Sequence, residues 1–199
     1  DQTQTSWRAD VKPTKKPPRA ALKSQRPWLR HYEPGVPYTI AVPNIPVHHL
    51  LRSAVRRFPL RTALLFEGAR FSYRRLNHEV NRLANALIGL GVGEGARVVL
   101  LLPNVPQVVI GFYGVLKAGG TAVFMPPMTE PAELVRQVKE AEASVLVTLT
   151  NWAGLAAQLQ RECAVPHVVL TDPAEYLVFY KQCVSRWRNR GMQLANMIP

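Results

Sequence analysis

Three alternating glycines, Gly91, Gly93 and Gly95, lie beside an aliphatic run in the segment LIGLGVGEGARVVLLLPN. Glycine amides can cradle a nucleotide phosphate when the loop follows a strand and opens a helix, because the free amides of the helix N-terminus then face the anion. The periodicity here predicts the reverse order, a helix before the glycines and a strand after them. Position 96, where the last glycine of a dinucleotide fingerprint would stand, is Ala. The pattern therefore favours a turn over a phosphate site.

The segment KAGGT at residues 117–121 also combines a lysine with glycines. A P-loop places its glycines before the lysine and follows a strand. Here Lys117 precedes the glycines and ends an apolar helical pattern. We therefore expect a helix C-cap at Gly119.

Two groups of adjacent polar residues have the types that bind metals or transfer protons. His48 and His49 are consecutive in a predicted helix, so we expect them to point to different faces and not to chelate one metal together. Asn77, His78 and Glu79 are also consecutive in a helical pattern and should diverge. Neither group predicts a metal site or an acid–base pair.

The chain has two cysteines, Cys163 and Cys183. Two are too few for a disulfide framework or a four-cysteine zinc site, which favours a reducing, cytosolic setting. Cys163 is predicted to end a helix, where the helix dipole raises the pKa of a thiol and disfavours a nucleophile. We assign no catalytic, cofactor-binding or metal-ligating residue in this sequence.

The composition is that of a soluble globular chain: 199 residues, 47% hydrophobic and 19% charged. No window approaches the roughly 20 consecutive apolar residues of a membrane-spanning helix. The first residues contain no hydrophobic region of a secretory signal and no initiator Met, so we expect a chain cut at its beginning.

The formal net charge of +12 is concentrated at the N-terminus. Residues 1–30 hold eight Lys and Arg against two Asp, which gives +6, and they are interrupted by four prolines. We expect a basic, disordered tail over 1–30 rather than a nucleic-acid-binding arm. Further prolines predict an extended lead-in over 31–46.

Periodic patterns begin near residue 47. The segment VHHLLRSAVRRF predicts a short helix with one apolar face, made of Leu50, Leu51, Ala54, Val55 and Phe58. The segment TALLFEGARFSY then predicts a hairpin that turns at residues 67–68. After it we expect a helix with Ser72 as its N-cap and Gly91 as its end.

From residue 96 the chain alternates strands and helices. The apolar segments ARVVLLLP, TAVFM, SVLVTL and PHVVL read as strands, and helical patterns separate them. The first of these helices should be capped by Asn104, and the second should turn Leu134, Val138 and Ala141 inward. Continuous apolar strands joined by helices predict an α/β fold with a mostly parallel sheet, covered on both faces, over residues 47–172.

Residues 173–199 form a separate C-terminal stretch. Within 173–191 an aromatic and apolar stripe, with Lys181 and three arginines beside it, predicts a basic amphipathic helix. Such a helix either packs on its own domain or contacts a membrane surface peripherally.

Residues 28–170 resemble the N-terminal region of the AMP-forming acyl-CoA synthetases, within the acyl-adenylate-forming superfamily. The similarity lies in the order of FSYRRLNHEVNRLANAL, GVGEGARVVLLLPN and GVLKAGGTAVFMPPM. The earlier segment RPWLRHYEPGVP resembles the long-chain fatty-acid–CoA ligases in particular. The resemblance implies the N-terminal part of the large domain of an adenylate-forming enzyme.

In that family a carboxylate attacks the α-phosphate of ATP to give acyl-AMP and pyrophosphate, and the thiol of CoA then displaces AMP. The resemblance implies ATP, Mg²⁺ and CoA as cofactors of the full-length enzyme and a fatty acid or other carboxylate as substrate. The family's phosphate-binding loop and catalytic lysine do not occur among these 199 residues. We therefore expect this chain alone to bind none of the cofactors and to be inactive.

The alternative from another functional class is a non-catalytic basic domain. It would use residues 1–30 and 181–190 to bind a membrane surface or nucleic acid, and of these two we favour the membrane. In either case we expect a cytoplasmic location, with peripheral membrane contact left open.

Overall fold

The computed structural model describes residues 26–37, 39–40 and 42–177, and the chain divides into two units, residues 1–44 and 45–199. In the first unit a 3₁₀ helix, η1 (Pro27–His31), begins at a proline, whose fixed φ suits the first helical position. Most of the tail predicted over 1–30, and most of the helix predicted over 173–191, lie outside the described residues.

The second unit begins with helix α2 (His48–Arg57), which confirms the helix predicted there. Leu51 is buried and packs in one cluster with Leu76, Val80 and Ile110. The predicted apolar face is only partly covered, because Leu50 remains 56% exposed.

Strands β1 (Thr62–Phe66) and β2 (Ala69–Ser72) pair antiparallel, as predicted. The turn between them places Glu67 at φ 49° and Gly68 at φ 86°. Two consecutive positive φ angles match the right-handed twist of the strands, which is why two-residue hairpins use such turns.

Helix α3 (Tyr73–Gly89) begins and ends as the sequence predicts. The Ser72 hydroxyl accepts a hydrogen bond from the Arg75 amide at 3.2 Å and caps the first turn. Gly91 follows the helix at φ 83°, and the Val92 amide donates to the Leu87 carbonyl at 2.9 Å. This is the Schellman arrangement, which needs a left-handed residue and so favours glycine.

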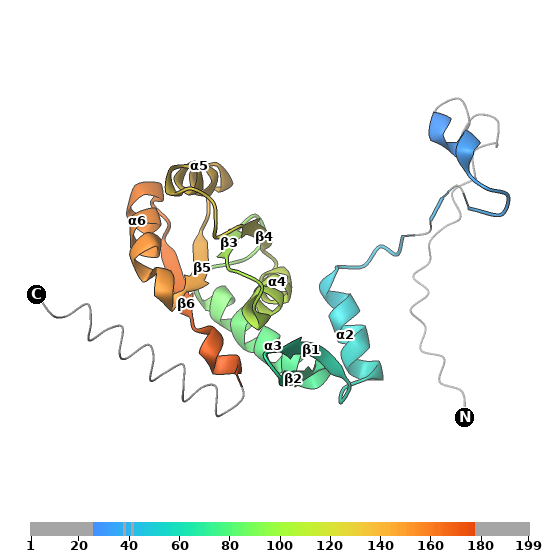
Figure 1. The fold of residues 1–199 in the computed structure, drawn as a ribbon, viewed down its shortest axis with the longest axis horizontal. Coiled ribbons are helices and arrows are strands. Elements are labelled where there is room, and N and C mark those ends of the chain that lie inside the picture. Colours follow the sequence, from blue (N-terminus) through green and yellow to red (C-terminus); the bar gives the residue numbers. More distant parts are fainter. Residues whose placement is uncertain (1–25, 38, 41, 178–199) are drawn as a thin grey trace, which may run out of the picture. The chain divides into compact units, whose positions relative to one another are not determined.

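The remaining strands form one parallel sheet (Figure 1). They are β3 (Arg97–Leu101), β4 (Thr121–Met125), β5 (Val145–Leu149) and β6 (His167–Thr171), in the spatial order β4-β3-β5-β6. The connections are α4 (Pro106–Ala118), α5 (Pro131–Ala141), and η2 (Thr150–Trp152) followed by α6 (Ala153–Cys163). The predicted α/β fold with a parallel sheet is confirmed.

Helices cover both faces of this sheet. Val99 and Leu101 pack on the face of α5 and α6, in one cluster with Leu134 and Leu159. The alternate strand residues, Val98 among them, pack on the face of α3 and α4. Burial of both faces explains why the strands are continuously apolar. Leu134 and Val138 are buried as predicted, and Ala141 is partly buried against the same cluster.

The predicted cap at Asn104 is wrong. Helix α4 begins at Pro106, its N-cap is Val105, and no side chain of the described residues caps it. Proline presets the helical φ and has no amide hydrogen to satisfy, and it holds Val105 in an extended conformation (φ −123°, ψ 160°). The other end is as predicted, because Gly119 is the C-cap at φ 89°.

After β6 the described chain ends in a 3₁₀ helix, η3 (Pro173–Tyr176). The Asp172 carboxylate accepts a hydrogen bond from the Ala174 amide at 2.8 Å, and Leu177 is extended. The α-helix predicted over 173–191 therefore does not begin at residue 173. Within the described residues, no helix combines the length and apolar character needed to cross a bilayer.

Candidate functional site

The strand order creates a switch point at the carboxyl edge of the sheet. Helix α4, which follows β3, covers one face of the sheet. Helix α5, which leads into β5, covers the other face. Ligands of open α/β sheets bind in the crevice beyond such a point, because the connections diverge there. The two segments that flank this point are the one after β3, with Asn104, and the one after β5, with Thr150 and Asn151, and all three residues are exposed.

Gln107 crosses this edge from the first turn of α4. Its Nε2 donates to the Asp172 carbonyl at 2.9 Å and to Thr171 Oγ1 at 3.3 Å. The side chain is buried, with 6% of the residue exposed. A main-chain carbonyl can only accept, so this bond fixes which end of the amide faces β6.

The other end of the same amide is a buried acceptor. Gln107 Oε1 finds no hydrogen-bond partner among the described residues. Buried polar atoms are normally satisfied, so this acceptor is an exception. Sequence reasoning missed this residue, and the available signal was a lone glutamine in the first turn of a strongly apolar helix.

Beneath the switch point the sheet itself has a fully buried polar side chain. The Thr148 hydroxyl donates to the Leu101 carbonyl at 2.9 Å and joins β5 to β3. This group is satisfied and therefore structural.

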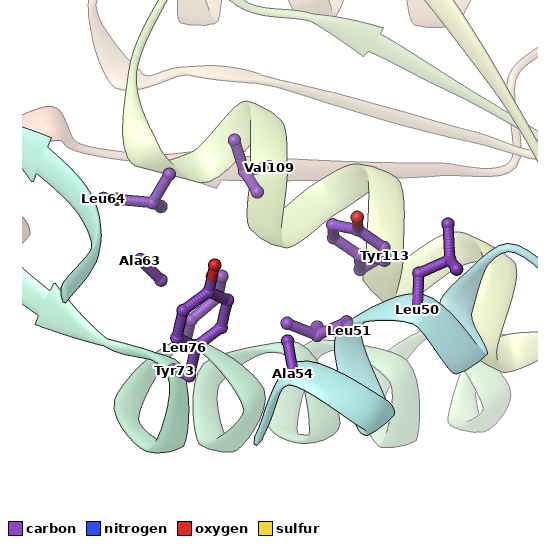
Figure 2. A pocket seen from close by; sticks show the side chains of 9 residues that line it. All are labelled: Leu50, Leu51, Ala54, Ala63, Leu64, Tyr73, Leu76, Val109 and Tyr113. Carbon is purple, nitrogen blue, oxygen red and sulfur yellow. The ribbon is translucent and has the colours of Figure 1, made fainter. Parts of the chain in front are cut away.

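A second candidate is an apolar pocket of about 330 Å³ in the unit 45–199 (Figure 2). Its volume is at the small end of the range for ligand sites. Four elements contribute its lining: Leu50, Leu51 and Ala54 from α2, Ala63 and Leu64 from β1, Tyr73 and Leu76 from α3, and Val109 and Tyr113 from α4. The two tyrosines are its polar groups, and in Figure 2 the side chains of all four elements point into one gap.

The glycine-rich segments lie at the opposite, amino edge of the sheet. Gly91 and Gly95 have φ angles of 83° and 82° and connect α3 to β3. They open a strand, as predicted, so no helix N-terminus adds amides to this turn. That the turn binds no phosphate stays a prediction.

The KAGGT segment has a packing role. Gly119 ends α4, and a Cβ on Gly120 would come within 2.9 Å of Val92 Cγ1 and 3.2 Å of the Ala96 carbonyl oxygen. Lys117 Nζ donates to Asn77 Oδ1 at 3.4 Å and also to Asn81 Oδ1. The lysine therefore joins α4 to α3.

One part of the expectation for the two histidines is wrong, because their side chains do not diverge. That they chelate no metal together stays a prediction. The rings of His48 and His49 lie edge to face, with their centroids 4.8 Å apart and their planes at 81°. They occupy the first turn of α2, where no preceding turn restricts the side-chain rotamers, so the rings can turn toward each other. Burial lowers the pKa of His48, and the nearby His49, Lys117 and Arg52 lower it further.

The other polar groups diverge as predicted. Asn77 bonds to Lys117, whereas Glu79 forms an ion pair with Arg82 at 3.0 Å. Cys163 Sγ donates to the Val135 carbonyl at 3.5 Å. Burial is the main cause that raises the pKa of its thiol, which disfavours a thiolate.

The described residues bring together no group of three or more His, Cys, Asp or Glu that could hold a metal ion. We assign no step of phosphoryl chemistry to them.

Comparisons with known proteins place this chain among adenylate-forming enzymes. The AMP-binding enzyme family matches residues 51–190. The long-chain-fatty-acid–CoA ligase of Bacillus subtilis (strain 168) is 34% identical over 160 residues, which are 80% of this chain and 29% of that protein. The ligase of the same name from Escherichia coli O6:H1 is 30% identical over 152 residues, 75% of this chain and 27% of that protein.

A solved structure, the anthranilate CoA ligase AuaEII in complex with anthranoyl-AMP, aligns with a TM-score of 0.61 and 26% identity. The alignment covers 69% of this chain and 26% of that one. The chain therefore spans less than a third of the length of the relatives that it matches.

Proposed function

The chain belongs to the AMP-binding enzyme family, and on that premise we propose that it is the N-terminal portion of a ligase that activates long-chain fatty acids. The observation that carries this proposal is the 34% identity to a long-chain-fatty-acid–CoA ligase over 160 residues. The fold supports it, because the parallel sheet between two helical layers aligns with a CoA ligase at a TM-score of 0.61.

The proposed reaction has two steps. An oxygen of the fatty-acid carboxylate attacks the α-phosphorus of ATP, the bond to the β-phosphate oxygen breaks, and pyrophosphate leaves. The CoA thiol then loses its proton and attacks the acyl carbon, and AMP leaves with the oxygen that joined it to the acyl group. Bound Mg²⁺ would neutralise phosphate charge in the first step.

We propose that residues 45–177 act as a scaffold in this reaction. Transfer of a phosphoryl centre needs amide or cationic donors that converge on it. At the carboxyl edge the Gln107 amide nitrogen makes a structural bond instead, because it joins the first turn of α4 to the end of β6. The groups that contact ATP would then come from other parts of the whole protein.

The test is an assay of the product of the complete reading frame for release of AMP. We expect release that requires a long-chain fatty acid, ATP and CoA together, and little release with benzoate or anthranilate in place of the fatty acid. The purified 199-residue chain is the control, and we expect from it no acid-dependent exchange of pyrophosphate into ATP. A complete product that releases no AMP with any acid would refute the ligase, and exchange by the short chain would refute the scaffold role.

A further inference from the structure

One glutamine connects three elements at the carboxyl edge of the sheet. Gln107 lies in the first turn of α4, and its Nε2 donates to the carbonyl of Asp172, the residue directly after β6. The same carbonyl accepts a second hydrogen bond, from the Glu175 amide at 3.1 Å, which closes the turn of η3. The Gln107 side chain therefore holds the start of α4 to the start of η3.

Further contacts hold η3 in place beyond this bond. The ring of Tyr176 packs edge to face on the ring of Phe71 from β2, with the centres 5.4 Å apart. Tyr176 also joins the apolar cluster that contains Ile110 of α4. These contacts keep η3 against β2 and α4, and the bond from Gln107 fixes the point at which the chain enters η3.

The amide of Gln107 is in local conflict with its surroundings. The other buried residues of α4 have no polar side chain, and Gln107 is only 6% exposed. Its Oε1 has no hydrogen-bond partner among the described residues. A buried acceptor that is left unpaired gives back part of the stability that the Nε2 bond supplies. Natural sequences accept such conflicts mainly at functional sites.

The position of this bond in the sheet points to the kind of function. Helix α4 follows β3 and η3 follows β6, and β5 lies between these two strands. Open α/β sheets bind nucleotides beyond the carboxyl ends of their strands, at the switch point of the strand order. In the proposed ligase reaction, ATP is the nucleotide of the first step. The two segments that Gln107 joins therefore border the switch point where such a ligand binds.

We infer that Gln107 is a positioning residue for ATP in the whole ligase, an inference that rests on the proposed function. The side chain does not contact the nucleotide, because it is buried and its Nε2 is bonded to the protein. It holds the starts of α4 and η3 at a fixed separation. Loss of the bond lets these segments move, and a displacement of about 1 Å in a positioning segment can cost about 10²-fold in rate.

The first experiment measures acid-dependent exchange of pyrophosphate into ATP by the product of the complete reading frame. Gln107→Leu should raise the KM for ATP by about tenfold and leave the KM for the fatty acid nearly unchanged. The matched control is Thr148→Val, which removes another buried hydrogen bond of the same sheet, from the Thr148 hydroxyl to the Leu101 carbonyl. It should lower stability and retain both KM values, and circular dichroism should show both variants folded.

The variant Gln107→Glu makes the donor dependent on pH. An ionised carboxylate only accepts hydrogen bonds, so at about pH 8 the bond to the Asp172 carbonyl should be lost. A protonated carboxyl has one O–H donor, and burial raises the pKa of a carboxyl. The KM of Gln107→Glu for ATP, divided by that of the parent at the same pH, should therefore fall as the pH is lowered to about 6. The same ratio for Gln107→Leu should stay constant.

A measurement on the 199-residue chain tests the role of the bond without the ligase. Hydrogen exchange at the Glu175 amide, which shares its acceptor with Gln107, should be severalfold faster in Gln107→Leu than in the parent. Thr148→Val should leave this rate closer to that of the parent. An unchanged rate in Gln107→Leu would show that the bond does not hold η3 and would overturn the inference.

The outcomes separate this inference from the ligase proposal. An active parent whose KM for ATP is unchanged in Gln107→Leu, or equally raised in Thr148→Val, would refute the positioning role and leave the ligase standing. A parent that exchanges no pyrophosphate with any acid would refute the ligase and the positioning role with it.

Discussion

Gln107 and Asp172 meet across the carboxyl edge of the sheet, where Gln107 Nε2 donates to the Asp172 carbonyl at 2.9 Å. Helix α4 follows β3, and Asp172 follows β6, which lies two positions away in the strand order. The bond therefore joins segments on either side of β5. It holds the start of α4 at the switch point where ligands of such sheets bind.

Replacement of Gln107 by Leu should lower the free energy of unfolding by about 1 to 3 kcal/mol, because it leaves the Asp172 carbonyl without this donor. Urea denaturation measures the change. The control is Gln158→Leu, which removes an exposed bond from Gln158 to Glu162 and should change stability by less than about 0.5 kcal/mol. Equal effects would show that the bond across the edge adds no stability.

Gly120→Ala should destabilise the chain by about 1 to 3 kcal/mol, because the new methyl group would press on Val92 and on the Ala96 carbonyl. The matched change is Gly154→Ala in α6, where a Cβ meets nothing within 4 Å. That change should be neutral or stabilise the helix by up to about 1 kcal/mol. Thermal denaturation of both variants compares them, and a tolerated Gly120→Ala would show that Val92 can move aside.

The Tyr176 hydroxyl should ionise at a higher pH than that of an exposed tyrosine. Burial raises its pKa to about 12, with smaller contributions from Glu79 and Glu175. A group whose pKa is raised on folding favours the folded state fully below its unfolded pKa of 10 and loses that contribution as the pH rises toward 12. Tyrosinate absorbance, taken as the difference between the parent chain and Tyr176→Phe, should titrate near pH 12. A midpoint near 10 would show that the ring is solvated.

Cys163 should react slowly with iodoacetamide, because burial raises the pKa of its thiol and leaves little thiolate at pH 8. The measurement uses a Cys183→Ser variant, so that only one thiol is alkylated. Addition of urea should restore the rate of an exposed cysteine. A rate in the native protein that matches the rate in urea would contradict the burial of this side chain.

Local patterns in the sequence determined most of the secondary structure. The hairpin at residues 67–68, the cap at Ser72 and the helix ends at Gly91 and Gly119 all follow from backbone preferences of single residues or from short periodicities. The cap assigned to Asn104 failed for a local reason as well, since Pro106 begins the helix without one. These features depend on neighbours in the chain, which a sequence displays directly.

Only the tertiary structure decided which segments meet. The strand order β4-β3-β5-β6 and the bond from Gln107 to Asp172 join residues far apart in the chain. Periodicity tells which side of an element is buried but not which element covers it. That choice comes from the combined burial of both faces of the sheet, a property of the whole packed unit.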